Sequence, residues 1–366
     1  MQRLTVVLVL GVALFAAAPS ALGAPVTLRA DHRVARYDDS VRFRGTLPTP
    51  APQQVSLIRN GVVVRSAVAS GGAFAFDLRL RAPGSFVART IAGDSSPVVV
   101  RLSPLLRARL VGRRMIGYRV MLVGRVLPAR AGRLVLGRSR VRVATDGRFR
   151  ARVLTTRGPH VSSKLRLLPA QGYVGVRRRL RLRLAQPQLR LGSHGPGVRA
   201  LKATLWQQRY ALPGVDAGFG YKTYEAVLAF QKVHRLPRTG QVGRDFWRVL
   251  WRTSAPRARR RGDYLEVDKS RQVVFEVRKG HVVNVIHAST GATGNTPVGT
   301  WRVYSEIAGW SWVLWQPMYF LRGFAIHGYP SVPPWPASHG CVRVPMWLAT
   351  SLRERWGYGS IVRVFA

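Results

Sequence analysis

The chain has 366 residues and is 47% hydrophobic, which is enough to bury several cores and excludes a chain that is disordered by composition. Its formal net charge is +44, from 59 basic and 15 acidic residues, which indicates either a solvated basic surface or attraction to a polyanion. No nucleic-acid-binding motif accompanies this charge, so we expect no nucleic acid as a partner. Together with the export signal predicted from the first residues, the charge favours anionic cell-wall polymers or lipid headgroups as partners.

The start of the chain predicts an export signal at residues 1–23. Arg3 supplies the positive start, residues 4–18 form an apolar run, and Ala21 and Gly23 provide the small residues of a cleavage site. The apolar run is short for a membrane span of ~20 residues, so we expect cleavage, with an uncleaved anchor as the alternative. No later segment is apolar enough to span a membrane. We therefore predict an exported protein of the periplasm or cell wall without a stable transmembrane anchor.

Residues 26–102 and 103–183 predict two copies of one β-rich unit. Each copy has a glycine inside an apolar run and a later phenylalanine that follows a Gly-x pair. Residues 74–80 alternate between apolar and other side chains, which is typical of a half-buried strand. The matching positions are Gly45 with Gly124 and Phe74 with Phe149. Two small antiparallel sandwiches follow from this pattern, and we interpret them as a spacer or a wall-facing module.

Residues 188–252 change from a period of two to helical spacing. Val198, Leu201 and Leu205 would lie on one helix face, and glycine-rich turns precede two later helices at 218–220 and 240–243. This pattern predicts a small three-helix domain. The arginine-rich residues 253–262 then predict a basic, exposed linker.

Several positions in this helical segment carry a resemblance to the helical peptidoglycan-binding domain. They are the run 215–220, Thr223, Ala226, Val227, Phe230, Gln231, Val242, Gly243 and Leu250. The resemblance implies a wall-binding domain. A plain three-helix spacer is the alternative reading of the same helical pattern.

Residues 263–366 return to strands. Strands are predicted at 264–267, 272–277, 282–289 and 300–304, and the apolar residues 324–326 indicate a buried strand. A short helix is predicted from Pro345 to Trp356, with Pro345 at the first helical position. The whole chain is thus expected to be multidomain and mainly β, with one small helical domain.

The single cysteine, Cys341, points to chemistry. Exported proteins normally pair their cysteines, and a solitary one cannot form an intramolecular disulfide. A thiol attacks a carbonyl as thiolate, so it needs a base or a positive environment. His327 ends an apolar strand, His339 lies two residues from the cysteine, and Arg343 adds positive potential. Gly340 allows a tight turn, and its N–H with that of Cys341 would form an oxyanion hole.

Two other readings of this cluster stay open at this point. Cys341 would be an inert buried thiol, or it would form part of a zinc site with His327 and His339. No further ligand motif such as Cys-x-x-Cys or His-Glu-x-x-His accompanies them.

Four motifs then carry a resemblance to the L,D-transpeptidase catalytic domain. They are Thr-Pro-Val-Gly at 296–299, Met-Tyr-Phe at 318–320, Ile-His-Gly at 326–328 and Ser-His-Gly-Cys-Val-Arg at 338–343. The resemblance implies a β-rich fold with the cysteine at the mouth of a groove. It also implies that stem peptides of peptidoglycan are the substrate, that no metal or organic cofactor is needed, and that carbapenems acylate the cysteine.

The resemblance also implies a role for each matching residue. Cys341 is the nucleophile, His327 is the base, His339 is the second histidine and Gly340 is an oxyanion donor. Residues expected to contact substrate are Arg343, Ser338, Gly328, Tyr319 and Met318. The alternative for Arg343 is a structural ion pair.

The stretch between His327 and Ser338 is shorter than in many family members and holds Pro333, Pro334 and Pro336, which implies a short, stiff wall to the groove. The predicted function is peptidoglycan crosslinking through a thioester on the cysteine. The alternatives are an L,D-carboxypeptidase that uses the same thioester and a non-catalytic wall-binding scaffold.

Overall fold

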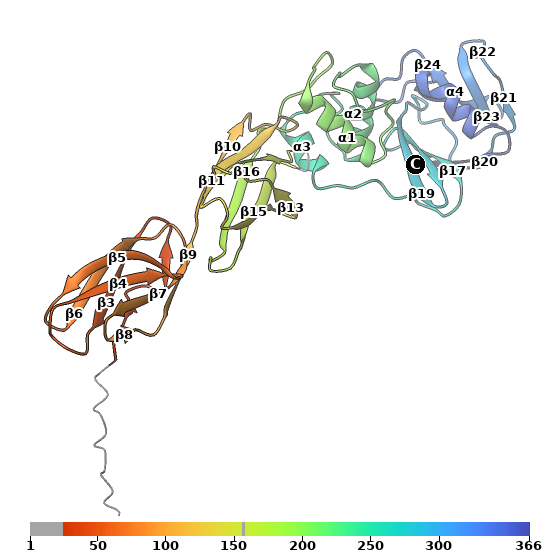
Figure 1. Ribbon diagram of the computed structural model, residues 1–366. Helices are drawn as coiled ribbons and strands as arrows, with labels where there is room; N and C mark the ends of the chain where they lie inside the picture. The colour runs from red at the N-terminus through yellow and green to blue at the C-terminus, as the bar shows by residue number, and fades with distance from the viewer. Residues whose placement is uncertain (1–24, 156–157) are drawn as a thin grey trace, which may run out of the picture. The chain divides into compact units, whose positions relative to one another are not determined.

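The computed structural model describes residues 25–155 and 158–366, so the predicted export signal lies outside the described part of the chain. These residues form a mainly β structure (Figure 1). They divide into two compact units. The first unit holds residues 25–108, 124–149 and 165–178, and the second holds the other described residues. Within the described residues, no helix has the length and apolar character required to cross a bilayer.

The first β repeat is built from two sheets around an aliphatic and aromatic core. One sheet has the order β1 (Arg29–Ala30), β3 (Ser40–Thr46) and β6 (Ala73–Arg79). The other has the order β2 (Val34–Arg36), β9 (Val98–Ser103), β7 (Gly84–Thr90), β4 (Gln53–Arg59) and β5 (Val62–Ala69), with β8 (Gly93–Asp94) paired to β7. Phe43 and Phe86 are fully buried between the sheets, with ring centroids 4.5 Å apart. The predicted small sandwich is therefore confirmed for this repeat, except that β2 and β9 pair in parallel, so the repeat is not wholly antiparallel as expected.

The second β repeat also has two sheets. One has the order β10 (Leu105–Gly112), β11 (Val120–Leu127) and β14 (Arg148–Val153). The other has the order β13 (Ser139–Val141), β12 (Gly132–Leu136), β15 (His160–Pro169) and β16 (Val176–Arg183).

The internal repeat read from the sequence is visible in one packing detail. A Cβ added to Gly45 would lie 2.2 Å from the Phe74 ring, and one added to Gly124 would lie 2.5 Å from the Phe149 ring. Both glycines thus leave room for the equivalent aromatic ring. The two copies share this contact because the same two residue types recur at matching positions.

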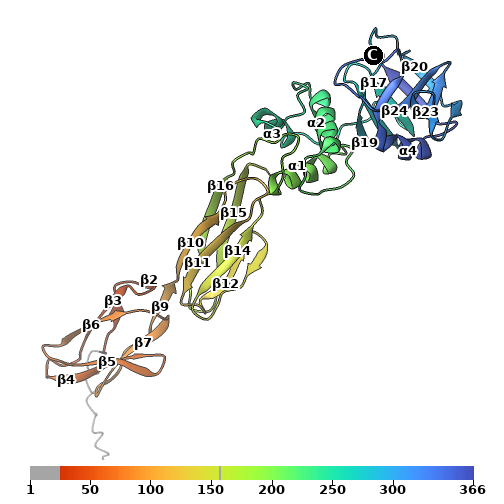
Figure 2. The same cartoon turned by 90° about the horizontal axis from the view of Figure 1, so that it is seen from above.

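The helical domain has three helices, α1 (Pro196–Gln207), α2 (Tyr221–Val233) and α3 (Arg244–Leu250), which Figure 2 shows grouped together. Each begins directly after a glycine, as the sequence predicted for the last two. Val198, Leu201 and Leu205 of α1 are buried on the predicted face.

The last domain packs two sheets and one helix around a single core. The first sheet has the order β19 (His281–His287), β18 (Val273–Arg278), β17 (Tyr264–Asp268), β26 (Ile361–Phe365) and β20 (Gly299–Arg302). The second has the order β21 (Ser305–Glu306), β23 (Leu314–Leu321), β24 (Phe324–Tyr329) and β25 (Val342–Pro345), with β22 (Trp310–Ser311) paired to β23. Helix α4 (Met346–Arg355) follows β25 directly and packs on β23 and β24.

One predicted detail of this region is corrected. Pro345 is the cap residue that ends β25, and the helix begins one residue later than expected, because the proline continues the strand pairing with Tyr329. Residues 253–262, the predicted basic and exposed linker, are all partly or fully exposed, and Arg259 ties them to the last domain through ion pairs with the buried carboxylates of Glu266 and Asp268.

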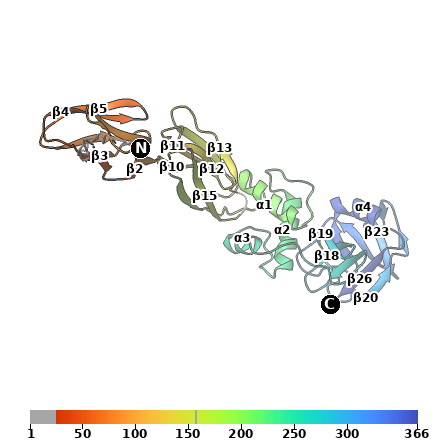
Figure 3. The same cartoon turned by 60° about the horizontal axis from the view of Figure 1, so that its bottom comes forward.

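The helical domain joins the last domain through backbone and side chains. The Ala211 N–H donates to the Val285 carbonyl at 3.0 Å, and the Val285 N–H donates to the Arg209 carbonyl at 2.7 Å, so this segment extends the sheet beside β19. Helix α2 lies against β19, as Figure 3 shows. Nearby, the Trp347 indole N–H donates to Glu225 at 2.7 Å. The helical domain is therefore packed on the last domain within one compact unit.

Candidate active site

The single cysteine lies at the start of the ladder between β24 and β25. These strands pair in parallel, with His327 opposite Arg343 and Ile326 opposite Val342. Side chains alternate along a strand, so Cys341, Arg343 and His327 share one face, while Ile326 and Val342 join the core. The topology thus brings three predicted site residues together on the face that points away from the core.

The sulfur of Cys341 is half-buried between backbone groups. The Ala325 N–H lies 3.4 Å from the sulfur as a donor, and the Gly323 carbonyl lies 3.6 Å away as an acceptor for the thiol proton. Burial raises the pKa of the Cys341 thiol, while the Ala325 N–H and the Arg343 guanidinium act in the opposite direction. Because burial is the largest effect, the sulfur rests as a thiol and needs a base to become a nucleophile.

His327 is 2% exposed and its ring is held in one tautomer. Its Nδ1 lies 2.9 Å from the Gly328 carbonyl oxygen, which can only accept, so Nδ1 carries the proton and Nε2 keeps its lone pair. Burial is the main cause that lowers the pKa of His327 to about 4; the hydrogen bond to the Gly328 carbonyl acts in the opposite direction, and the nearby Arg343 adds a smaller lowering effect. The ring is therefore neutral at neutral pH and able to accept a proton at Nε2.

Among the hydrogen bonds of the described residues, none joins the sulfur of Cys341 to the His327 ring. Hydrogen bonds between a nucleophile and its base are often loose before substrate binds and tighten in the reacting complex. The two groups start as a neutral thiol and a neutral imidazole, in place of a preformed ion pair.

The turn that precedes the cysteine requires glycine and is fixed by a serine. Gly340 has φ 141°, and a Cβ there would lie 2.4 Å from the Phe324 ring. The Ser338 hydroxyl accepts the Gly340 N–H at 3.0 Å and donates to the Cys341 carbonyl at 2.5 Å. Ser338 therefore organises the turn instead of facing substrate. The Gly340 N–H is already bonded, so only the Cys341 N–H stays a predicted oxyanion donor.

Two residues to which the sequence analysis gave no role support this turn. The Thr296 hydroxyl accepts the Gly291 N–H at 2.9 Å and donates to the Gly340 carbonyl at 2.7 Å. The Asn295 amide donates to the His339 carbonyl at 2.6 Å. The Thr-Pro-Val-Gly motif marked Thr296 in the sequence. Its hydrogen bond to the Gly340 carbonyl could not be predicted, because the fold brings these two distant segments together.

The side chain of Arg343 forms no hydrogen bond with the part of the chain that the structure describes. Its guanidinium carbon lies 4.1 Å from the centre of the Tyr329 ring. None of the ion pairs within residues 25–155 and 158–366 includes Arg343, so the structural ion-pair alternative finds no partner there. Its N–H groups are therefore able to hold a carboxylate of a peptide. The side chain of His339 is exposed, and its predicted role in positioning substrate stays a prediction.

Strand alternation separates the remaining predicted substrate contacts. Met318 is 1% exposed and belongs to the core, so the prediction that it contacts substrate is wrong. Tyr319 pairs with Ala325 and so lies on the same sheet face as His327. Gly328 is buried against Ala349 and acts through its carbonyl on His327.

The part of the chain that the structure describes contains no group of three or more His, Cys, Asp or Glu side chains that could hold a metal ion. The zinc reading of the cysteine cluster therefore lacks a ligand set among these residues.

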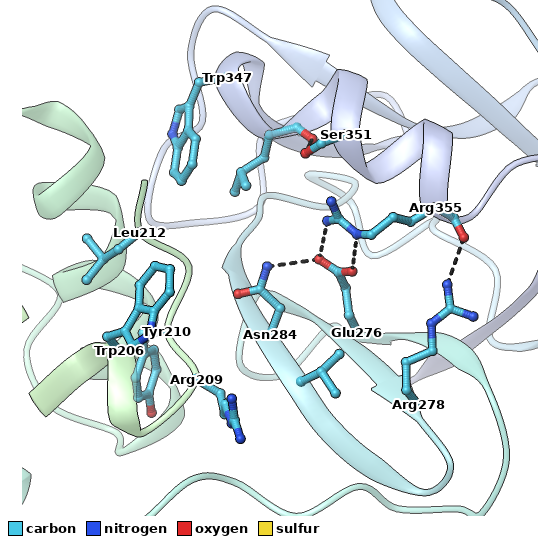
Figure 4. Close-up of a pocket in the computed structure, with 12 residues that line it drawn as sticks. Trp206, Arg209, Tyr210, Leu212, Glu276, Arg278, Asn284, Trp347, Ser351 and Arg355 are labelled. Carbon is cyan, nitrogen blue, oxygen red and sulfur yellow. Dashed lines mark hydrogen bonds and ion pairs between the residues drawn. The ribbon is translucent and has the colours of Figure 1, made fainter. Parts of the chain in front are cut away.

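A separate cavity of about 460 Å³ lies where the helical domain meets the last domain (Figure 4). Trp206 and Tyr210 line one side, and Trp347 and Arg355 line another. The Arg355 guanidinium binds the Glu276 carboxylate at 2.8 Å, as the dashed lines in Figure 4 mark. No residue of the cysteine cluster lines this cavity, so it belongs to the domain junction.

Two protein families match the chain. The L,D-transpeptidase catalytic domain family matches residues 262–364, and a peptidoglycan binding domain family matches residues 194–250. No curated protein sequence matches the chain.

Solved structures similar to the chain include three L,D-transpeptidases. The enzyme from Xylanimonas cellulosilytica is 36% identical, with 50% of this chain and 98% of that chain covered and a TM-score of 0.47. The enzyme from Stackebrandtia nassauensis is 24% identical, with 49% of this chain and 95% of that chain covered and a TM-score of 0.31. The catalytic domain from Enterococcus faecium is 21% identical, with 30% of this chain and 100% of that chain covered and a TM-score of 0.27.

Proposed function

Because the chain belongs to the L,D-transpeptidase family, we propose that it crosslinks peptidoglycan stem peptides through a thioester on Cys341. The family match and the adjoining peptidoglycan binding domain support peptidoglycan as the substrate. We further propose that the protein is exported, since its first residues have the pattern of a secretion signal.

The first step would be acyl transfer to sulfur. Cys341 Sγ attacks the carbonyl carbon that precedes the terminal D-alanine of a donor tetrapeptide, and the thiol proton moves to His327 Nε2. The tetrahedral intermediate then collapses, the carbon–nitrogen bond breaks, and the proton passes from Nε2 to the departing amine. D-alanine leaves and the donor remains as a thioester.

The second step would transfer the acyl group to an amine. The side-chain amine of a diamino acid on a neighbouring stem attacks the thioester and gives a proton to His327. The carbon–sulfur bond breaks, and the sulfur recovers its proton from the imidazole.

One observation carries this proposal. The Gly328 carbonyl holds the proton on His327 Nδ1, which leaves Nε2 unprotonated on the same sheet face as the cysteine. An inert structural thiol would need no buried imidazole prepared in this way, because burying a histidine at the expense of its charge costs stability.

The test uses purified protein with a disaccharide tetrapeptide donor, and mass spectrometry of both protein and products. We expect a thioester adduct on Cys341, release of D-alanine and formation of crosslinked dimers. Cys341→Ala should reduce turnover by at least roughly 10³-fold and leave binding to isolated walls intact. Turnover that survives in Cys341→Ala would refute the assignment of the nucleophile.

The product analysis also separates the two rivals. Trimmed monomers without dimers would indicate an L,D-carboxypeptidase, in which water accepts the acyl group. Wall binding with neither adduct nor products would indicate a non-catalytic scaffold. A carbapenem offers an independent check, because it should add its mass to wild-type Cys341 and not to the Cys341→Ala variant.

A further inference from the structure

The segment 331–337 leads directly from the strand that carries His327 to the turn that carries Cys341. Three of its residues are prolines, at 333, 334 and 336, and these have no N–H to donate. The segment therefore depends on groups from elsewhere to bind its carbonyl oxygens.

Side chains of other elements hold three of these carbonyls. His287 Nε2 lies 2.7 Å from the Val332 oxygen and Arg238 Nη1 lies 2.7 Å from the Pro334 oxygen. The Ser289 hydroxyl donates to the Trp335 oxygen at 2.7 Å. Arg238 belongs to the helical domain, which thus contacts the segment directly.

The helical domain also reaches the segment through a buried lysine. Lys232 of α2 is 1% exposed, and its Nζ lies 2.8 Å from His287 Nδ1. The Val332 carbonyl can only accept, so His287 carries its proton on Nε2 and accepts from Lys232 at Nδ1. A continuous chain of donors therefore runs from α2 through His287 to Val332.

Lys232 has two more acceptors, the Gln272 carbonyl at 3.0 Å and the Ala288 carbonyl at 2.7 Å. With His287 Nδ1, these acceptors are enough for every N–H that the Lys232 amine carries in either protonation state. None of the ion pairs within the described residues supplies this lysine with a carboxylate, and burial lowers its pKa well below the usual range. An apolar side chain would hold two domains together without this desolvation cost, so the buried polar chain indicates a need for precise geometry.

We propose that Lys232 and Arg238 of the helical domain are positioning residues for the reaction at Cys341. They fix the segment 331–337, Lys232 through His287 and Arg238 directly, and the segment in turn fixes the turn that carries the sulfur. The helical domain is then a part of the catalytic unit in addition to any role in wall binding. This inference rests on the proposed function for its kinetic readout.

The test compares Lys232→Met and Arg238→Gln with two matched controls in the full chain. Lys164→Met and Arg244→Gln replace the same residue types at exposed positions. For both test variants we expect kcat/KM for the tetrapeptide donor to fall about 10- to 100-fold, mainly through KM, because a small displacement near a reacting group is costly. Alkylation of Cys341 by iodoacetamide, which needs no groove wall, should stay within about threefold of wild type.

Hydrogen exchange gives a readout that does not depend on activity. The N–H groups of Ala337 and Ser338 both donate to the Thr290 carbonyl, and their exchange should become at least 10-fold faster in the test variants and stay unchanged in the controls. Arg238 is only partly buried, so Arg238→Gln decides the matter if Lys232→Met does not fold.

Folded test variants with wild-type exchange and wild-type kcat/KM would overturn the inference. Faster exchange at these two amides, in a protein whose wild type converts no stem peptide, would support the positioning contacts and refute only the proposed reaction.

Discussion

The β repeats and the C-terminal part of the chain bury very different side chains. In residues 25–155 and 158–183 the buried polar side chains are Gln53, Ser95 and Thr155, none of which is charged at neutral pH. From residue 188 onward they include charged and titratable groups. These are Lys202, Lys232, Glu266, Asp268, Glu276, His287 and His327. Burying a charged side chain costs free energy unless it is hydrogen-bonded. The concentration of such side chains therefore marks a region in which fixed side-chain positions matter in addition to stability.

The two regions also use their few carboxylates differently. Asp77 of the first repeat pairs with Arg42 in solvent, where both side chains are about half exposed. Glu276 is buried and receives bonds from Asn284, Arg355 and Trp356. A solvated pair contributes little to stability, whereas removal of one partner from a buried network leaves charge uncompensated.

After the loss expected for Cys341→Ala, the largest effect in the C-terminal region should come from the proposed base. His327→Gln removes the proton acceptor beside a thiol that burial keeps protonated, so kcat/KM for the donor peptide should fall about 10²- to 10⁴-fold. Steady-state kinetics with a circular dichroism control measure this loss. A decrease of less than threefold in a folded variant would mean that another group takes the proton.

The same histidine should make stability depend on pH. Its folded pKa of about 4 lies below the unfolded value of 6.5, so between these values the unfolded chain binds more protons. Its contribution is complete above pH 6.5 and is lost as the pH falls towards 4, by about 3 kcal/mol at pH 4. Urea unfolding at pH 7 and pH 4 should show this loss in wild type, and a smaller loss in His327→Gln. Equal losses in the two proteins would contradict it.

A smaller effect is expected at the support of the cysteine turn. Thr296→Val keeps the shape and removes the bonds to the Gly291 N–H and the Gly340 carbonyl, which should cost about 1–3 kcal/mol of unfolding free energy. Thr300→Val, at an exposed position of β20, is the control and should unfold like wild type. Urea unfolding of wild type and both variants at pH 7 measures the difference. Equal unfolding midpoints for Thr296→Val and wild type would show that other contacts hold the turn.

The smallest effect belongs to the β repeats. Asp77→Asn breaks the exposed pair with Arg42 and should leave the thermal midpoint and the turnover unchanged. Calorimetry and the same kinetic assay test this. A clear decrease in the thermal midpoint or in the turnover would mean that exposed ion pairs of the β repeats contribute to stability or activity, against the expectation.

Local patterns in the sequence determined much of this architecture. Alternation and glycine–phenylalanine spacing predicted the β repeats, and helical periodicity with glycine turns predicted α1, α2 and α3. The strands β17 to β20 and the strand that carries His327 followed from apolar runs, whereas β23 and β26 were not predicted. The sequence analysis used Arg343 only for its charge, although strand alternation, which is a local property, also puts Arg343 on the same face as Cys341.

Tertiary structure alone decided which of those residues meet and in what state. Met318 and Tyr319 are neighbours in one motif, yet the sheet register sends Met318 into the core and Tyr319 to the face of His327. The tautomer of His327, the partners of Thr296 and the route from Lys232 to Val332 all depend on contacts between distant segments. Hydrogen bonding and burial set protonation, and both arise only when the chain has folded, so no local pattern could have fixed them.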